Sequence, residues 1–406
     1  MMNYEQAMEK LNQYGQTQIL RFYEELNEEQ KASLLDQIEK VDFNSINLEP
    51  LDAVKGNIEP LGAMKLAEIA ARKEELKEAG LKSIRDGKVA ALLLAGGQGT
   101  RLGLDGPKGT LNVGLTKELY IFQCLINNLM DVVNEAGVWI PLFIMTSDKN
   151  DAATRAFLKE HDYFGYNSDY IRFFVQEMAP ATDFEGKVYL EAKDHIALSP
   201  NGNGGWYKSM QTAGYEELLD QMGIEWINIF AVDNVLQRIA DPVFVGATVL
   251  SGCEVGAKVI SKAAPDEKVG VMCYRNGRPS IVEYYDLNET MMYQKDENGD
   301  YAYNSGVILN YLFRTSALKR IADMNMPLHI AKKKIPYVDE NGVFIKPEEV
   351  NGNKYESLVL DMIEMMEGCL AFEVERAKEF APIKNMHGVD SLDSAREMLQ
   401  ANGIEL

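Results

Sequence analysis

Several features are scarce in this 406-residue chain, and each scarcity excludes a class of protein. The four cysteines are widely spaced and form no C-x-x-C pair, so we expect buried free thiols in a reducing compartment. Positive charge is in the minority, and the net charge of −21 argues against nucleic acid or an anionic membrane as a partner. No apolar run approaches the roughly 20 residues that span a bilayer, and the polar, acidic start is unlike a signal peptide. We therefore expect a soluble cytoplasmic protein.

Histidine is also scarce, and the four that exist are scattered along the chain. The sequence shows no His/Cys cluster typical of a zinc site and no Ser/His/Asp arrangement typical of a nucleophilic triad. We expect structural roles for His161, His195, His329 and His387. Apolar residues make up 46% of the chain, which is enough for a sizeable core and for two domains.

The most informative segment, residues 92–109, reads LLLAGGQGTRLGLDGPKG. The apolar run Val89–Leu94 ends in four closely spaced glycines, with Arg101 among them and Lys108 just after them. Glycine lets backbone N–H groups approach a ligand, and a row of such groups can cradle an anion. The two cations can reach a phosphate chain from that cradle. We interpret the segment as a nucleotide-triphosphate loop at the end of a central strand.

Three other interpretations of this loop were weighed. The glycines follow G-x-G-x-x-x-G, one residue longer than the dinucleotide fingerprint, and Lys108 lies between Pro107 and Gly109 rather than in the G-K-[ST] of a P-loop. A simple strand-to-helix turn without a ligand is the third alternative. Turn geometry requires neither Arg101 nor Lys108, so the nucleotide loop is favoured.

Strand and helix patterns alternate from residue 88 onward and predict an α/β fold. The alternation implies a mostly parallel sheet with helices on both faces, whose ligands bind beyond the carboxyl ends of the strands. Polar residues follow three of these ends: the glycine loop, Gln176 and Asp233–Asn234. The predicted strands are Val89–Leu94, Trp139–Thr146, Ile171–Val175 and Trp226–Val232, and the predicted helices are Tyr120–Ala136, Asp151–Glu160 and Trp206–Met222.

The chain on either side of this region follows other patterns. Residues 1–86 have helical spacing, with Asn27 and Gln30 suited to a capping box, and predict a helical layer. After residue 263, alternating segments flank Asn276-Gly277, a strong hairpin signal. There we expect strands at Val269–Tyr274, Ser280–Tyr285, Tyr303–Leu309 and Cys369–Glu375, and helices at Tyr355–Glu367 and Asp393–Asn402.

The glycine loop, LAGGQGTRLG followed by PKG, resembles the signature of the UTP-dependent sugar-1-phosphate uridylyltransferases. It is most similar to that of the eukaryotic-type UDP-N-acetylhexosamine pyrophosphorylases. Further similar blocks follow in the same order: IMTSD, GNGGWY, VDN, VGV, IVEY, KKIPYVD and FAPIKN. The resemblance implies a Rossmann-like (GT-A-like) nucleotidyltransferase domain over residues 87–384, after the helical segment 1–86 and before a tail helix in 385–406.

The resemblance also implies a role for individual residues. UTP and a sugar 1-phosphate are the expected partners, and Mg²⁺ is the expected cofactor. The catalytic contacts to phosphate fall on Arg101, Lys108 and Lys384, and the metal ligand is Asp233. The nucleotide-binding positions are Leu94, Ala95, Gly96, Gly97, Gln176 and Gly202, with Gln176 facing the uracil. The sugar-binding positions are Asn203, Gly270, Glu283 and Asn304.

The chemistry of such a transfer suits these residue types. The nucleophile is a phosphate oxygen that is already ionised at neutral pH, so positioning and charge neutralisation are needed rather than a general base. Without the resemblance, simpler interpretations stay open for three of the residues. Asp233 is either a metal ligand or the N-cap of a following helix. Lys384 could be a solvated surface lysine, and Glu283 an outward-facing carboxylate on a strand.

Three departures from the family pattern bear on specificity and assembly. Asn201 replaces an aspartate before the GNGG block, and Val307 replaces an asparagine after Asn304-Ser305-Gly306. We expect the C-terminal β-rich domain of eukaryotic members to be absent, so an oligomer contact attributed to it is not carried over, and a monomer is slightly favoured. We expect N-acetylglucosamine 1-phosphate as the sugar substrate. A glucose or galactose 1-phosphate uridylyltransferase, a nicotinamide dehydrogenase and a non-catalytic nucleotide-sugar sensor are the alternatives.

Overall fold

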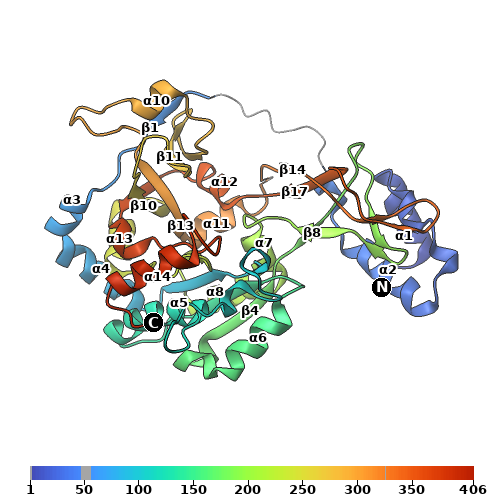
Figure 1. Cartoon of the computed structure of the whole chain (residues 1–406), viewed down its shortest axis with the longest axis horizontal. Helices are drawn as coiled ribbons and strands as arrows, with labels where there is room; N and C mark the ends of the chain where they lie inside the picture. The colour runs from blue at the N-terminus through green and yellow to red at the C-terminus, as the bar shows by residue number, and fades with distance from the viewer. Residues whose placement is uncertain (1, 47–55, 325) are drawn as a thin grey trace. The chain divides into compact units, whose positions relative to one another are not determined.

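The structure is a computed structural model that describes residues 2–46, 56–324 and 326–406 (Figure 1). The chain forms two compact units. The smaller unit contains residues 1–54, 177–205 and 325–359, and the larger unit contains residues 55–176, 206–324 and 360–406. The part of the predicted N-terminal helical segment at 47–55 lies outside the described residues. The helices of that segment are divided between the two units.

Among the described residues of the smaller unit are two amphipathic α-helices and four short β-ribbons. Helix α1 spans Tyr4–Gln13 and α2 spans Glu28–Lys40. Helix α2 begins with the predicted capping box, in which Asn27 and Gln30 exchange side-chain and backbone hydrogen bonds. Buried apolar residues of both helices pack against Val188, Leu190 and Ile196. The paired strands are β5 (Met178–Pro180) with β8 (Leu198–Pro200), β6 (Leu190–Ala192) with β7 (His195–Ile196), β14 (His329–Lys333) with β17 (Gly352–Glu356), and β15 (Tyr337–Val338) with β16 (Phe344–Ile345).

A ten-stranded mixed sheet is the centre of the larger unit, within the described part of the chain. Its path runs β1-β11-β13-β9-β2-β3-β4, with β10 paired to β13 and β18, and β12 paired to β11. Strands β9, β2, β3 and β4 are mutually parallel, whereas β13 is antiparallel to β9. The bounds are β1 Ile58–Pro60, β2 Val89–Leu94, β3 Leu142–Thr146, β4 Ile171–Val175, β9 Trp226–Ala231, β10 Val255–Ser261, β11 Val271–Arg275, β12 Arg278–Val282, β13 Ser305–Arg314 and β18 Cys369–Glu373.

Helices cover both faces of this sheet, as the sequence predicts. Alternate residues of β2 and β3 pack into one core with helices α4, α5 and α9. On the opposite face, Tyr215 of α8 contacts the rings of Phe143 on β3 and Phe174 on β4. All six residues of β2 are buried, which fits a central parallel strand. The helices of this unit are α3 Leu66–Ala71, α4 Lys73–Arg85, α5 Ile121–Ala136, α6 Asp151–Glu160, α7 Trp206–Thr212, α8 Tyr215–Met222, α9 Pro242–Ser251, α10 Glu289–Tyr293, α11 Thr315–Ile321, α12 Val359–Glu364, α13 Arg376–Glu379 and α14 Leu392–Ala401.

The extents of two predicted helices are wrong. The segment Trp206–Met222 forms two helices, because Gly214 adopts a left-handed conformation (φ +77°) between α7 and α8. The predicted helix Tyr355–Glu367 contracts to α12, because Tyr355 belongs to β17, where its buried hydroxyl lies 2.9 Å from the hydroxyl of Thr182. The predicted hairpin at Asn276-Gly277 is confirmed, with positive φ at both residues.

All four cysteines are free thiols, as expected; Cys124 and Cys273 are buried, and Cys253 and Cys369 are half-buried. Across the described ranges, the structure contains no helix with the length and apolarity needed to cross a membrane.

Candidate active site at the carboxyl edge of the parallel strands

Four parallel strands of the larger unit end at the same edge of the sheet. Leu94 of β2 pairs with Ala231 of β9 on one side and with Met145 of β3 on the other. Thr146 at the end of β3 pairs with Val175 of β4. The glycine loop, Asp233 and Gln176 therefore leave the sheet next to one another, as the sequence predicts for parallel strands.

The glycine loop folds back on itself after β2. The backbone N–H of Gly99 donates to Gly106, and the N–H of Lys108 donates to the carbonyl of Gly97 (3.2 Å). Leu94 and Ala95 are buried where the loop begins, and Gly97 is exposed. Of the loop glycines, Gly103 has a positive φ (+72°), whereas Gly99 is required by space, since a Cβ there would lie 2.6 Å from Leu104.

Asn150 fixes the start of the loop, a function that the sequence analysis missed. This fully buried side chain donates to the carbonyl oxygens of Ala95 (2.9 Å) and Gly97 (3.3 Å). Its own oxygen accepts from the N–H of Ser147 (2.8 Å). The sequence could have indicated this role, because Asn150 follows the end of the parallel strand β3 by four residues.

Gln176 lies against the glycine loop. It follows β4, is buried, and its backbone N–H donates to Thr146. A Cβ on Gly96 would lie 2.9 Å from both the oxygen and the nitrogen of the Gln176 amide. The absence of a side chain at Gly96 therefore makes room for this amide at the mouth of the loop.

A C-terminal segment returns to the end of β9 and joins Asp233 to Lys384. The N–H of Ile383 donates to the carbonyl of Asp233 (2.9 Å), and Asn234 pairs with Pro382 in an isolated bridge. The alternative in which Asp233 caps a helix is wrong, because the next helix, α9, begins at Pro242 and is capped by Asp241. Asp233 is half-buried at this junction.

Charges of both signs meet around Lys108. Burial is the main cause that lowers the pKa of the Lys108 ammonium group; the carboxylate of Asp233 raises that pKa, and the positive charges of Lys384 and Arg101 lower it. The structure thus brings Arg101, Lys384 and the predicted metal ligand Asp233 within electrostatic range of Lys108. Lys384 is exposed and forms an ion pair with Asp390 (2.9 Å), and Arg101 is exposed.

The predicted sugar-binding positions of the larger unit lie on and beside β11, β12 and β13. A Cβ on Gly270 would lie 3.4 Å from Val307 and 3.9 Å from a carboxylate oxygen of Glu283. Glu283 follows the last residue of β12 and is half-buried. The side-chain oxygen of Asn304 accepts from the backbone N–H of Lys262 (3.0 Å).

Gly202 and Asn203 belong to the smaller unit, unlike the other predicted positions. Gly202 has φ +86°, and a Cβ there would lie 2.2 Å from the carbonyl oxygen of Ser357. Asn203 accepts from the backbone N–H of Val359 (3.0 Å). Both residues are therefore held against the strand-to-helix connection after β17.

Within the larger unit, the site combines a glycine-rich loop, three cations and the carboxylate of Asp233 at the carboxyl edge of the parallel strands. Such a site can bind a phosphate chain and neutralise the charge on its oxygens. Fold and site together define a nucleotidyltransferase class of α/β protein.

The comparisons with known proteins identify the family within that class. The family model of UTP–glucose-1-phosphate uridylyltransferase matches residues 31–403, so the chain belongs to this family of nucleotidyltransferases. It is 37% identical to UDP-N-acetylhexosamine pyrophosphorylase-like protein 1 of Mus musculus, over 93% of this chain and 79% of that protein. It is 36% identical to UDP-N-acetylglucosamine pyrophosphorylase of Saccharomyces cerevisiae, over 92% and 84% of the two chains.

A solved structure agrees with this assignment. The uridine diphosphate N-acetylglucosamine pyrophosphorylase of Trypanosoma brucei, in complex with an inhibitor, superposes with a TM-score of 0.84 at 28% sequence identity. The match covers 99% of this chain and 85% of that one. The predicted fold class and family are thereby confirmed.

Proposed function

We propose that this enzyme forms a UDP-sugar and pyrophosphate from UTP and N-acetylglucosamine 1-phosphate. The observation that carries the proposal is the convergence of Arg101, Lys108, Asp233 and Lys384 beside the glycine loop. The names of the two relatives and of the protein in the solved structure support an N-acetylated hexosamine. Glucose 1-phosphate, the sugar in the family's description, is the second candidate.

The residues divide the work by chemistry. The sugar phosphate attacks the α-phosphorus of UTP, and the bond to the leaving pyrophosphate breaks. Arg101, Lys108 and Lys384 neutralise the charge that moves along the phosphate oxygens, since preorganised charges are effective in such transfers. Leu94, Ala95, Gly96, Gly97 and Gly202 hold the nucleotide, and the amide of Gln176 pairs with the donor and acceptor edge of uracil. Asn203, Gly270, Glu283 and Asn304 contact the sugar.

Mg²⁺ is the metal we assign to this reaction. Mg²⁺ is usually held by one or two carboxylates together with substrate phosphates and waters. The carboxylate of Asp233, close to Lys108, fits that pattern. No cluster of three or more acidic, cysteine or histidine metal ligands occurs among the described residues, so UTP itself would supply the other ligands. The bound ion would neutralise charge on the phosphate oxygens. The cytoplasmic location and the monomeric state stay predictions.

A substrate panel with and without chelator tests the function. We expect Mg²⁺-dependent pyrophosphate release from UTP with N-acetylglucosamine 1-phosphate, at a higher kcat/KM than with glucose or galactose 1-phosphate. Asp233→Asn should lose activity and recover part of it with excess Mg²⁺, whereas the surface control Asp220→Asn should behave as wild type. Activity that survives thorough chelation would refute the metal, and a higher kcat/KM for glucose 1-phosphate would establish the second candidate.

A further inference from the structure

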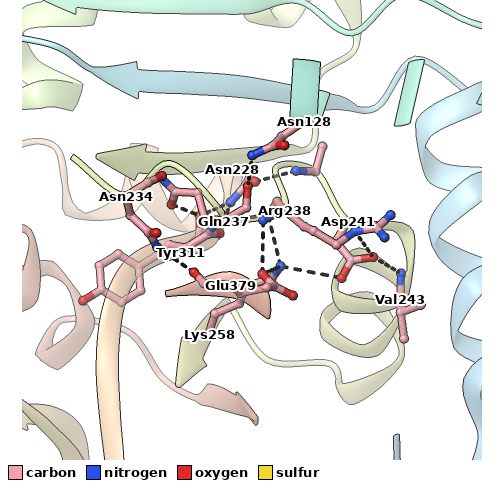
Figure 2. A network of polar contacts seen from close by, with 12 residues as sticks. Asn128, Asn228, Asn234, Gln237, Arg238, Asp241, Val243, Lys258, Tyr311 and Glu379 are labelled. Carbon is pink, nitrogen blue, oxygen red and sulfur yellow. Dashed lines mark hydrogen bonds and ion pairs between the residues drawn. The ribbon is translucent and has the colours of Figure 1, made fainter. Parts of the chain in front are cut away.

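A buried ion pair lies behind the loop that carries Asp233 (Figure 2). Lys258 on β10 is fully buried, and Glu379 at the end of α13 is 7% exposed. The Lys258 ammonium group lies 2.6 Å from a carboxylate oxygen of Glu379 and 3.6 Å from one of Asp241. Neither Lys258 nor Glu379 was identified from the sequence.

The pair clamps one residue of the Asp233 loop by both of its backbone polar groups. The carboxylate of Glu379 accepts from the N–H of Arg238 (3.2 Å), and Lys258 donates to the carbonyl of Arg238 (3.0 Å). Asn310 donates to the same carbonyl (3.2 Å). The far end of the loop is thus fixed to β10, β13 and α13 at once.

The near end of the loop is fixed to the same short helix by Asn234, which is 2% exposed. Its amide nitrogen donates to the carbonyl of Glu379 (2.7 Å), and its oxygen accepts from the N–H of Ala381 (2.9 Å). The next contact along the segment is the bond from Ile383 to Asp233. Glu379 is therefore bonded to Asn234, the residue next to Asp233 (Figure 2), and lies five residues before Lys384 in the chain.

Energetics favour a geometric role for this pair over a stabilising one. Removing two charges from water offsets most of their mutual attraction, so a buried ion pair adds little net stability. The loop also contains Ala240 in a left-handed conformation (φ +50°), whose N–H is held by Asn228 (2.7 Å). A loop with such a strained residue keeps one shape only where its surroundings determine it.

We propose that Lys258 and Glu379 are positioning residues that hold the loop of Asp233 against the backbone segment that carries Lys384. The inference rests on the proposed function, in which Asp233 holds the metal and Lys384 contacts phosphate. Neither Lys258 nor Glu379 touches the substrate. They act through Arg238, Asn234 and the segment 379–384.

Two matched variants test the proposal. Glu379→Gln removes the negative charge that pairs with Lys258, leaves a weaker acceptor for the N–H of Arg238, and keeps Lys258 beside Asp241. Asp241→Asn removes the other charge beside Lys258. The remaining partners of Asp241 are the side chain of Arg238 (4.0 Å) and the N–H of Val243 at the start of α9, so this variant leaves the backbone contacts of Arg238 in place. Hydrogen exchange at the amides of Ala381 and Ile383 is measured first, because it reports the segment without reference to activity. The Mg²⁺ concentration for half-maximal activity and the kcat are then measured, at a temperature well below the melting temperature of each variant.

The expected results separate positioning from general stability. Glu379→Gln should accelerate hydrogen exchange at both amides, raise the Mg²⁺ concentration for half-maximal activity and lower kcat. We expect each change to be about tenfold, because losing a contact that supports a metal ligand lowers metal affinity or activity by about 10- to 100-fold. Asp241→Asn should leave all three near wild type even if it melts earlier. Unchanged exchange in Glu379→Gln, or equal effects of the two variants, would overturn the proposal. An inactive wild type would instead refute the proposed function, while the exchange data still decide the positioning.

Discussion

The groups around Lys108 come from several distant parts of the chain. The Lys108 ammonium group is partly desolvated, next to one carboxylate and two other cations. A phosphate chain bound there would replace lost hydration and relieve the repulsion among the cations. The site is therefore arranged for an anion at the position where Lys108 ends the glycine loop.

Lys108→Ala should lower kcat strongly with little change in stability. Removal of one preorganised contact to transition-state charge lowers kcat by a factor on the order of 10²–10³. Steady-state kinetics and a melting curve check both halves of the prediction. Lys117→Ala is the control, since Lys117 is an exposed lysine of the same unit whose ion-pair partner is Glu405. A large drop in melting temperature with normal specific activity would mean that Lys108 is structural.

The pKa of Lys108 also predicts a pH dependence. Because burial lowers this pKa below the usual value for lysine of about 10.4, the free enzyme loses the charge of Lys108 at a lower pH than an exposed lysine would. The value of kcat/KM for UTP reports the free enzyme, so it should fall on the alkaline side as Lys108 deprotonates. Lys108→Arg keeps its charge at all accessible pH values and should lack this decline. A decline that is identical in Lys108→Arg would assign it to another group.

At the scale of elements, the glycine loop after β2 and the end of β4 form one structural unit. Gly96 and Gln176 come from the ends of two different strands, and the amide of Gln176 occupies the space that a side chain at position 96 would need. The loop therefore sets the position of the residue proposed to contact uracil.

Gly96→Ala should weaken UTP binding and its preference over CTP while the protein stays folded. The new Cβ would lie 2.9 Å from the Gln176 amide, and a flexible side chain can move away from it. We expect the KM for UTP to rise about tenfold, which corresponds to roughly one hydrogen bond of 1.4 kcal/mol. Gly106→Ala is the matched control, since Gly106 lies in the same loop, has no assigned contact to the nucleotide, and nothing lies within 4 Å of a Cβ there. Equal effects of both substitutions would show that the loop backbone, rather than Gln176, is responsible.

The sequence predicted the elements whose signals are local. The apolar run Val89–Leu94 and the helix ending at Gly137 match β2 and α5 closely, because a buried strand and a glycine C-cap leave clear patterns. The break at Gly214 was missed, since an isolated glycine is often tolerated within a helix.

The candidate site was predictable only in part, for a similar reason. Parallel strand ends placed the glycine loop, Gln176 and Asp233 at one edge from the alternation alone. The bond between Asn234 and Ala381 joins residues 147 positions apart, and that between Lys258 and Glu379 joins residues 121 positions apart. No local pattern encodes such pairings. The family resemblance placed Lys384 at the phosphates, but not the contacts that bring it to Asp233.

At the scale of the whole molecule, the cations of the site stand against a net charge of −21. Acidic residues outnumber basic ones by 62 to 41, so the folded chain carries a self-repulsion that its ion pairs do not neutralise. Most of the ion pairs in the described ranges involve partly or largely exposed side chains, and each such pair contributes only about 0–1 kcal/mol. Long-range repulsion should therefore outweigh them in the response to salt.

Added salt should accordingly stabilise this protein. Between about 0.01 M and 0.15 M ionic strength the Debye length shortens from roughly 30 Å to 8 Å, which screens repulsion across the molecule more than contacts within a pair. We expect the melting temperature to rise by about 1–3 °C over that range. In a chain of this size, a small increase in the free energy of unfolding produces a shift of that order. Differential scanning fluorimetry in NaCl and in KCl checks this, and the two salts should agree because screening depends on ionic strength. A melting temperature that falls with salt would mean that the exposed ion pairs stabilise the fold by more than the repulsion from the net charge destabilises it.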